Sequence, residues 1–199
     1  MEGDGSDAAR ATLLNSEFWQ REYQDGRSSG AIADLLSSIR GFRKAGSSIV
    51  VRAIDDKDSP GAEPDARMAS AIEQALQAHH PTRTFVLVGN VHSRVLKGYP
   101  WNPSADYMPL GARLKAGQGE MVGLSVKARR GTAWICVSGA ALDCGPKDAR
   151  VFEFTGAAPH LALDPEAAGK TGWSGTLYLE ELSASSPARL PAAGPAPHS

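Results

Sequence analysis

The chain has 199 residues, which is enough for one domain with a proper core and too few for two large ones. Its 21 lysines and arginines nearly balance its 22 aspartates and glutamates, so the formal net charge of -1 does not favour nucleic acid or an anionic membrane. No apolar run reaches the roughly 18 to 20 residues that span a bilayer, and the first four residues lack the basic start of a secretory signal. We expect a periplasmic or secreted protein if a signal peptide preceded this sequence, and a cytoplasmic one otherwise.

The N-terminal part is predicted to contain a loose arm followed by a helix. Residues 1–15 are small and polar with little periodicity, so we expect a flexible arm before a single domain at 16–182. From Ser29, apolar residues recur at three- and four-residue spacing on one helical face: Ile32, Leu35, Leu36, Ile39 and Phe42. A serine at this start can cap the first turn, and Gly41 or Gly46 can end the helix.

Two apolar runs flank a second predicted helix. Residues 84–88 are apolar or β-branched without polar alternation, which is typical of a strand buried on both faces, and residues 48–54 form another apolar run with Ile49, Val50, Val51, Ala53 and Ile54. A helix with one apolar stripe is predicted between them, over residues 64–80. Strand, helix and strand form a βαβ unit, whose right-handed crossover places both strand ends at the same edge of the sheet. The sequence therefore predicts an α/β fold with a mainly parallel sheet flanked by helices.

The C-terminal half is predicted to contain a loop and further strands. Residues 95–119 are rich in turn formers, and a loop this long in a compact domain is more often a binding lid than filler. Residues 121–126 and 132–137 resemble two strands joined by a charged turn that ends in glycine, which predicts an antiparallel hairpin. Residues 151–155 and 176–182 are expected to add edge strands.

The last segment of the chain has little to bury. Residues 183–199 consist mainly of Ala, Pro, Ser and Gly, so we expect a disordered tail. Just before it, Ala168 to Thr171 resemble the end of a phosphate-binding loop. The earlier glycine of that motif is replaced by Asp164 and no strong strand precedes it, so we do not interpret these residues as a nucleotide site.

Side chains suited to chemistry follow the second apolar run. Gly89 permits a sharp exit from the strand, so Asn90, His92 and Arg94 would stand at the rim where open α/β sheets bind ligands. Asp55 follows the first run and is the expected partner of His92, because neighbouring strands lie roughly 5 Å apart. An imidazole beside a carboxylate can hold a metal, act as a base near neutral pH, or simply stay hydrogen-bonded.

Other residues are expected around the same rim. Arg67, at the start of the crossover helix, is expected either to bind an anionic substrate group or to form a salt bridge with Asp55. The predicted lid contains three aromatic residues that are expected to contact a substrate or to pack on the site: Tyr99, Trp101 and Tyr107.

The only two cysteines are Cys136 and Cys144. Their separation suits a short disulfide-closed loop in an oxidising compartment, and two inert thiols are the equal alternative. Two cysteines are too few for a zinc site by themselves, although His160 could join them.

Three short stretches resemble one superfamily of proteins. They are Gln24–Ser29, Asp65–Ala69 and Val86–His92. With them the chain resembles, from about Phe18 to Cys144, the superfamily that joins erythromycin esterases, ChaN-like haem-uptake proteins and Tiki metalloproteases. Gly89-Asn90-Val91-His92 matches the later of that superfamily's two Gly-x-x-His motifs, while the first motif does not occur between Met1 and Ser28. The chain is therefore either the later part of a longer protein or lacks half of the usual site.

The resemblance implies a hydrolase-like domain that acts on a small molecule or a peptide. His92 and Asp55 would act as base or as ligands of a divalent metal, Arg67 or Arg94 would steady an anion, and Asn90 would contact the substrate. One alternative is a haem- or metal-binding protein of the same fold, with His92 as a ligand under the aromatic residues. Another is a non-catalytic domain that associates with a second copy or with a missing N-terminal half.

Overall fold

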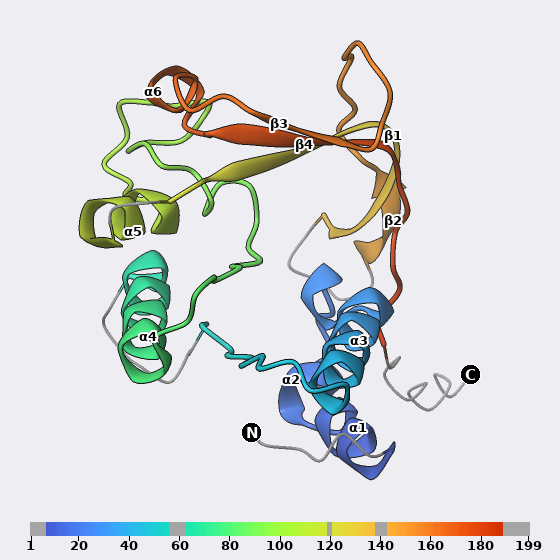
Figure 1. Ribbon diagram of the computed structural model, residues 1–199. Helices are drawn as coiled ribbons and strands as arrows, with labels where there is room; N and C mark the ends of the chain where they lie inside the picture. Colours follow the sequence, from blue (N-terminus) through green and yellow to red (C-terminus); the bar gives the residue numbers. More distant parts are fainter. Residues whose placement is uncertain (1–6, 56–62, 119–120, 138–142, 189–199) are drawn as a thin grey trace. The chain divides into compact units, whose positions relative to one another are not determined.

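The computed structural model describes residues 7–55, 63–118, 121–137 and 143–188 (Figure 1). Its helical elements are α1 (Asp7–Leu14), α2 (Glu17–Gln20), the 3-10 turn η1 (Gly26–Ser28), α3 (Gly30–Lys44), α4 (Pro64–His79), α5 (Leu110–Gln118) and α6 (Ala168–Thr171). Its strands are β1 (Leu124–Cys136), β2 (Cys144–Asp148), β3 (His160–Leu163) and β4 (Gly175–Leu182). Among these described elements, no helix has the length and apolarity needed to cross a membrane.

The chain divides into two compact units. The first unit comprises Met1–Val50, Arg130–Val151 and Glu181–Ser199, and the second comprises Val51–Arg129 and Phe152–Glu180. Both β1 and β4 begin in the second unit and end in the first. The single domain expected from the chain length stays a prediction.

The four strands follow the order β2-β1-β4-β3 across one sheet. The two outer pairs, β2 with β1 and β3 with β4, are antiparallel, and the remaining pair is parallel. Helices and a mixed sheet confirm the α/β class, but the prediction of a mainly parallel sheet was wrong. An antiparallel hairpin does lie in the C-terminal half, formed by β1 and β2.

The two apolar runs do not enter this sheet. Residues 48–54 and 84–88 have no regular secondary structure, and neither forms a ladder with any described strand. In the second run Phe85 is 93% exposed and Leu87 is 73% exposed. Only the last residues of the runs, Ile54 and Val88, pack on a hydrophobic core. Apolarity indicates that a segment favours burial, but it does not specify the partner that would bury it.

The charged segment that was predicted to be a turn lies instead within one strand. β1 continues through Gly131, whose φ of 133° is unfavourable for other residues and whose missing side chain leaves room for the backbone of Leu182. Arg129 and Arg130 form ion pairs with Glu180 and Glu181 on β4, at 3.3 and 3.1 Å. The two arginines therefore take part in cross-strand ion pairs, which stabilise the pairing of β1 with β4.

Of the other predicted strands, that at residues 176–182 is present as β4, but β4 lies between β1 and β3, so the prediction of an edge strand was wrong. Residues 151–155 form no strand beyond a bridge at Val151. The predicted lid is shorter than expected, because α5 begins at Leu110 inside it. Strand β3 was not predicted, since four residues of mixed polarity give no usable period.

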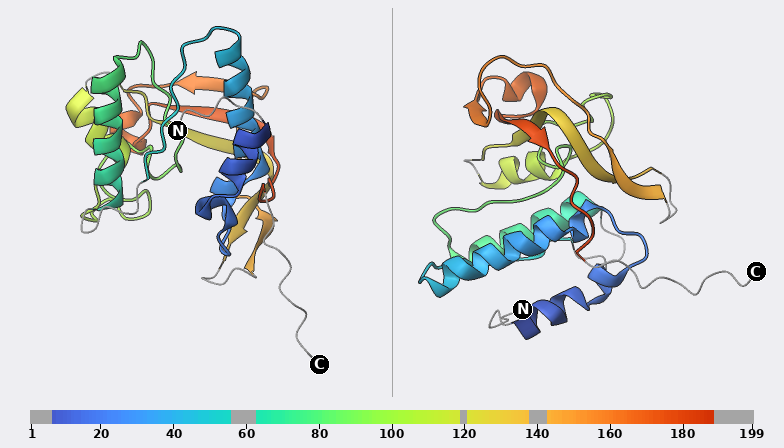
Figure 2. Two further views of the ribbon diagram at one scale, coloured as in Figure 1. Left: turned by 90° about the horizontal axis from the view of Figure 1, so that it is seen from below. Right: turned by 90° about the vertical axis from the view of Figure 1, so that its right-hand side faces the viewer.

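Helix α3 of the first unit begins and ends close to the prediction. The Ser29 side chain accepts a hydrogen bond from the backbone N–H of Ile32, and the chain leaves the helix at Gly46 with a φ of 94°. Part of the predicted arm forms helix α1, which lies next to α3 (Figures 1 and 2). Arg10 of α1 donates to the Ser37 hydroxyl of α3 at 2.6 Å, which joins the two helices.

Part of the predicted disordered tail is also bonded within the first unit. The backbone of Ser186 accepts from Gly30 N–H at 2.8 Å, and the N–H of Ala188 donates to Ser28 at 2.9 Å. Residues 183–188 are therefore hydrogen-bonded alongside the start of α3, and the prediction of disorder was wrong for them. Residues 189–199 and 1–6 lie outside the described part of the chain.

The two cysteines form a disulfide in the first unit. Cys136 and Cys144 are paired residues of β1 and β2, so the bridge closes the hairpin across its ladder. This arrangement selects the disulfide from the two alternatives that the sequence left open. It also removes both sulfurs from any zinc site with His160.

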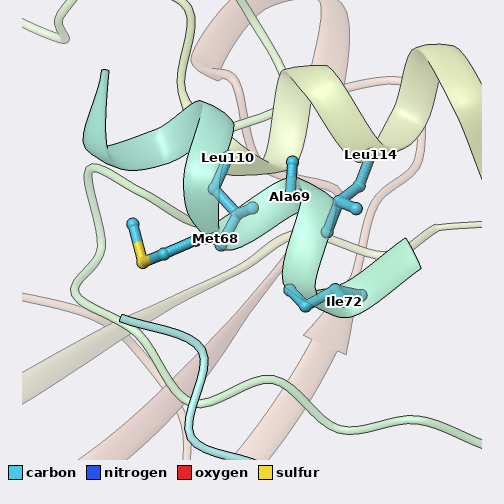
Figure 3. Packing of buried hydrophobic residues seen from close by; sticks show 5 residues of the cluster. All are labelled: Met68, Ala69, Ile72, Leu110 and Leu114. Atoms are coloured by element: carbon cyan, nitrogen blue, oxygen red, sulfur yellow. The ribbon is translucent and has the colours of Figure 1, made fainter. Parts of the chain in front are cut away.

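Helices α4 and α5 form the core of the second unit (Figure 3). The buried cluster consists of Met68, Ala69, Ile72, Leu110 and Leu114. Three of these side chains lie on the stripe of α4 that the helical period predicted. Burying side chains of this size contributes about 1.5 to 3 kcal/mol each, so the cluster fixes the start of α5 against α4.

Candidate functional site

The start of α4 places a carboxylate inside the second unit. Glu63 is the N-cap, and its side chain accepts hydrogen bonds from the backbone N–H groups of Asp65 and Ala66, both at 3.2 Å. Because Glu63 takes this capping role, the Asp65 side chain can point inward. Asp65 is only 1% exposed. A buried carboxylate must find hydrogen-bond donors, and the following contacts supply them.

His92 lies in a turn that is fixed to β1. The amide of Asn90 donates to the carbonyl of Val126 at 3.2 Å and accepts from its N–H at 3.1 Å. Ser93 donates to the carbonyl of Leu124 at 2.9 Å. The turn is therefore held at two points along the strand, and His92 between them is oriented toward α4.

Asp65, His92 and Tyr107 form one hydrogen-bonded cluster. Asp65 Oδ1 accepts from His92 Nδ1 at 2.8 Å and from the backbone N–H of Leu110 at 2.7 Å. Asp65 Oδ2 accepts from the Tyr107 hydroxyl at 3.1 Å. The same hydroxyl lies 3.4 Å from His92 Nδ1. We call these three side chains the Asp65 cluster.

The donors around Asp65 determine which nitrogen of His92 has the proton. An ionised carboxylate can only accept, so Nδ1 must donate, and Nε2 of the neutral ring then has the lone pair. In the part of the chain that the structure describes, Nε2 has no hydrogen-bond partner. The His92 side chain is 40% exposed, so solvent or a ligand can reach this nitrogen.

Tyr107 remains a neutral donor in this cluster. Burial raises its pKa, and the negative charge of Asp65 raises it further. The ring is stacked on Tyr99, with centroids 4.2 Å apart and planes at 6°. Tyr99 is in turn stacked on Trp101 at 5.1 Å. The aromatic residues of the loop thus form one stack that ends at the Asp65 cluster.

A pocket of about 590 Å³ opens beside the cluster. It is lined by Glu63, Asp65, Val91, His92, Tyr99, Asp106 and Tyr107, with Pro64 and Ala105. Its volume is in the range of small-molecule sites. The His92 ring and the stacked aromatic side chains are the groups that a ligand in this pocket would meet.

The structure brings together some of the predicted site residues and separates others. His92, Tyr99 and Tyr107 share the pocket, and Trp101 stacks on its aromatic wall. The carboxylate that contacts His92 is Asp65, so Asp55 was the wrong partner. Asp55 is exposed and does not line the pocket, because the run that precedes it is not a sheet strand beside residues 84–88.

The remaining predicted residues lie elsewhere. Arg67 does not line the pocket, and the amide of Asn90 is occupied by the backbone of Val126. Arg94 lines a separate pocket. Substrate contacts by these three residues stay predictions. One signal could have identified Asp65 from the sequence: it is an acid in the first turn of a helix that already has an acidic N-cap, Glu63.

The surroundings of His92 do not fit a divalent metal. Among the described residues, no group of three or more His, Cys, Asp or Glu side chains is placed to hold a metal ion. Both oxygens of Asp65 already accept hydrogen bonds from N–H or O–H donors. A catalytic zinc normally has three protein ligands, whereas His92 Nε2 is the one ligand atom that this cluster leaves available.

Comparisons of the chain with models of protein families, with curated proteins and with solved structures gave no match.

Proposed function

We propose that the chain is a hydrolase-like domain of the erythromycin-esterase and Tiki type, in which His92 is the general base. The observation that supports this is the 2.8 Å contact between His92 Nδ1 and the buried carboxylate of Asp65. A carboxylate in this position holds the imidazole in one orientation and stabilises the imidazolium that forms when the ring takes a proton. Asp65 would have this role whether His92 takes the proton from a side chain or from a water molecule.

The reaction that this cluster suits is attack of water on an ester or amide carbonyl. Nε2 takes a proton from water while the water oxygen bonds to the carbonyl carbon, and the protonated ring later gives that proton to the leaving group. Tyr107 positions Asp65 rather than moving a proton, because its raised pKa makes it a weak acid. The adjoining aromatic stack would bind the apolar part of the substrate.

Hydrolysis of 4-nitrophenyl acetate by purified variants tests the proposal. His92→Ala and Asp65→Asn should each lower kcat/KM by about 100-fold or more, because general-base catalysis contributes at least that much. The asparagine is informative because its amide can donate to Nδ1, which moves the ring proton to Nε2.

The matched control is His80→Asn. His80 is exposed, lies outside the pocket and has a φ of 44°, which asparagine tolerates. This variant should hydrolyse the ester at the wild-type rate. Equal rates for wild type and His92→Ala, with both proteins folded by circular dichroism, would refute the proposal.

A second candidate function is haem binding with His92 as an axial ligand. A histidine that binds a metal through one nitrogen usually donates its other N–H to a carboxylate or carbonyl, and His92 does so to Asp65. Haem needs a single histidine ligand, which the cluster can supply. A Soret band after addition of hemin, lost in His92→Ala and retained in His80→Asn, would favour this function over hydrolysis.

A further inference from the structure

A second pocket in the same unit is lined by basic side chains. It has a volume of about 610 Å³ and lies between the loop after Arg94 and the segment around α6. Its principal lining residues are Arg94, Lys97, Lys170, Pro100, Pro103 and Trp173. Among the residues that the structure describes, no aspartate or glutamate lines it. None of these residues lines the pocket beside the Asp65 cluster.

Arg94 is a buried cation that donates to two backbone carbonyls and lies over the Trp173 ring, 5.5 Å from its centroid. It is 4% exposed, and its guanidinium donates to the carbonyls of Gly98 at 3.1 Å and Thr171 at 2.5 Å. Within the described residues it contacts no carboxylate. Burial without an anion destabilises the charged form, and the pKa of Arg94 is lowered accordingly. A guanidinium has five N–H donors, so these two bonds leave donors available.

The backbone around Arg94 holds its side chain in place. Gly172 has a φ of 88°, and a Cβ there would lie 2.5 Å from Nη1 of Arg94. The N–H of Val95 donates to the carbonyl of Gly172 at 2.8 Å. The guanidinium is therefore packed against a glycine that leaves room for it, and the site is formed before any ligand arrives.

Two lysines add positive charge to the same pocket. Lys170 is exposed and has no ion-pair partner in the part of the chain that the structure describes. Lys97 contacts Asp106 at 2.8 Å, but that aspartate is almost fully exposed and lines the other pocket. An exposed pair of this kind is worth little, so Lys97 can turn to a bound anion at small cost.

We propose that this pocket binds the phosphate group of a small organic phosphate, with Arg94 and Lys170 contacting the phosphate oxygens. Arg and Lys together match a dianion, and the fork of arginine suits two phosphate oxygens at once. The remaining wall is apolar, formed by Leu96, Pro100, Pro103 and Trp173, so it can cover the organic part of the ligand. The contacts come from side chains, so this is a different kind of site from a glycine-rich nucleotide loop.

Isothermal titration calorimetry of the full chain with phenyl phosphate tests this inference. Phenyl phosphate should bind with 1:1 stoichiometry, more tightly than inorganic phosphate, which lacks the apolar part, and more tightly than benzoate, which has one negative charge. Binding should weaken as salt is added, because the contacts are electrostatic. Absence of saturable binding, or equal affinity for benzoate, would overturn the proposal.

Lys170→Gln is the decisive variant, since this exposed side chain can be changed without disturbing the fold. It should weaken phenyl phosphate binding about tenfold, as expected for the loss of one charge-assisted contact. Lys115→Gln is the matched control, because Lys115 is equally exposed, lies in the same unit and does not line the pocket. Equal weakening by both variants would show only a general charge effect and would refute the site.

Arg94→Lys gives a second test that retains the charge but removes the fork. It should weaken binding more than Lys170→Gln, while the thermal transition shows whether the variant is folded. His92→Ala should bind phenyl phosphate as the wild type does, because the two pockets have separate linings. Failure of this inference would therefore leave the proposed role of His92 intact, and the reverse also holds.

Discussion

The Asp65 cluster and the apolar segments 48–54 and 84–88 show opposite relations between polarity and burial. Asp65 has a polar, ionisable side chain yet is 1% exposed, and its two oxygens accept three hydrogen bonds from two side chains and a backbone N–H. The segment 84–88 is apolar yet largely exposed. Burial in this protein therefore follows from the presence of specific partners, and the sequence pattern reports only which residues would benefit from it.

The largest effect on stability is expected from Asp65→Ala. Removal of the carboxylate leaves His92 Nδ1–H, the Tyr107 hydroxyl and the Leu110 N–H without their acceptor, and each buried unsatisfied donor costs about 1 to 3 kcal/mol. Because His92 is partly exposed and can turn to water, we expect a total loss of about 3 to 5 kcal/mol in the free energy of unfolding. Urea denaturation followed by circular dichroism measures it.

Asp55→Ala is the control for that change. Asp55 is an exposed aspartate of the same unit, so its removal should cost less than about 1 kcal/mol. If the two alanine variants lost equal stability, the partner of His92 would not be the buried acid that the structure shows.

A smaller and pH-dependent effect is expected from Tyr107→Phe. Loss of the hydroxyl removes one donor to Asp65 and should cost about 1 to 2 kcal/mol at neutral pH. The raised pKa of Tyr107 means that the folded state holds the phenol proton more tightly than the unfolded state does. This contribution is fully present below the unfolded value of about pH 10 and is lost as the pH rises above it.

The wild type should therefore lose stability above pH 10 more steeply than Tyr107→Phe does. Denaturant midpoints of both proteins between pH 8 and 11 give the comparison. Tyr178→Phe, which also removes a hydroxyl from the second unit but lies outside the cluster, serves as the control. Parallel curves for wild type and Tyr107→Phe would contradict the burial of this phenol.

The sequence predicted elements whose signals are local. Helix α3 has a serine cap and a glycine exit, α4 has an apolar stripe, and β4 contains leucines with one threonine and one tyrosine, so the bounds of each were predicted nearly correctly. The choice of Asp65 depends on contacts between residues 27 to 45 positions apart, for which one sequence has no signal. The charged segment 127–131 was misinterpreted because its partners, Glu180 and Glu181, lie about 50 residues away.

The sequence singles out His92 by a local signal, a Gly-x-x-His motif after an apolar run, but that run is not the sheet strand at whose end His92 was predicted to lie. The carboxylate partner of His92 could not be predicted, because Asp55 and Asp65 both lie at an end of a predicted element before His92. The decisive difference is the capping of α4 by Glu63, which leaves Asp65 free to face the interior. The sequence predicts that the three aromatic residues of the loop lie near the site, but it does not predict the order in which they stack.

The smallest effect is expected from Phe85→Ser, although phenylalanine has a larger apolar side chain than Val88 in the same segment. Phe85 is 93% exposed, so little area leaves water when the chain folds, and stability should change by less than about 0.5 kcal/mol. Val88→Ala, three residues further along the same segment, should cost about 1 kcal/mol because Val88 packs on the core formed by α4 and α5. Thermal and urea unfolding of both variants give the order. A loss of 2 kcal/mol or more in Phe85→Ser would show that this segment is buried in solution, as the apolar run predicted, and would reverse the contrast with the Asp65 cluster.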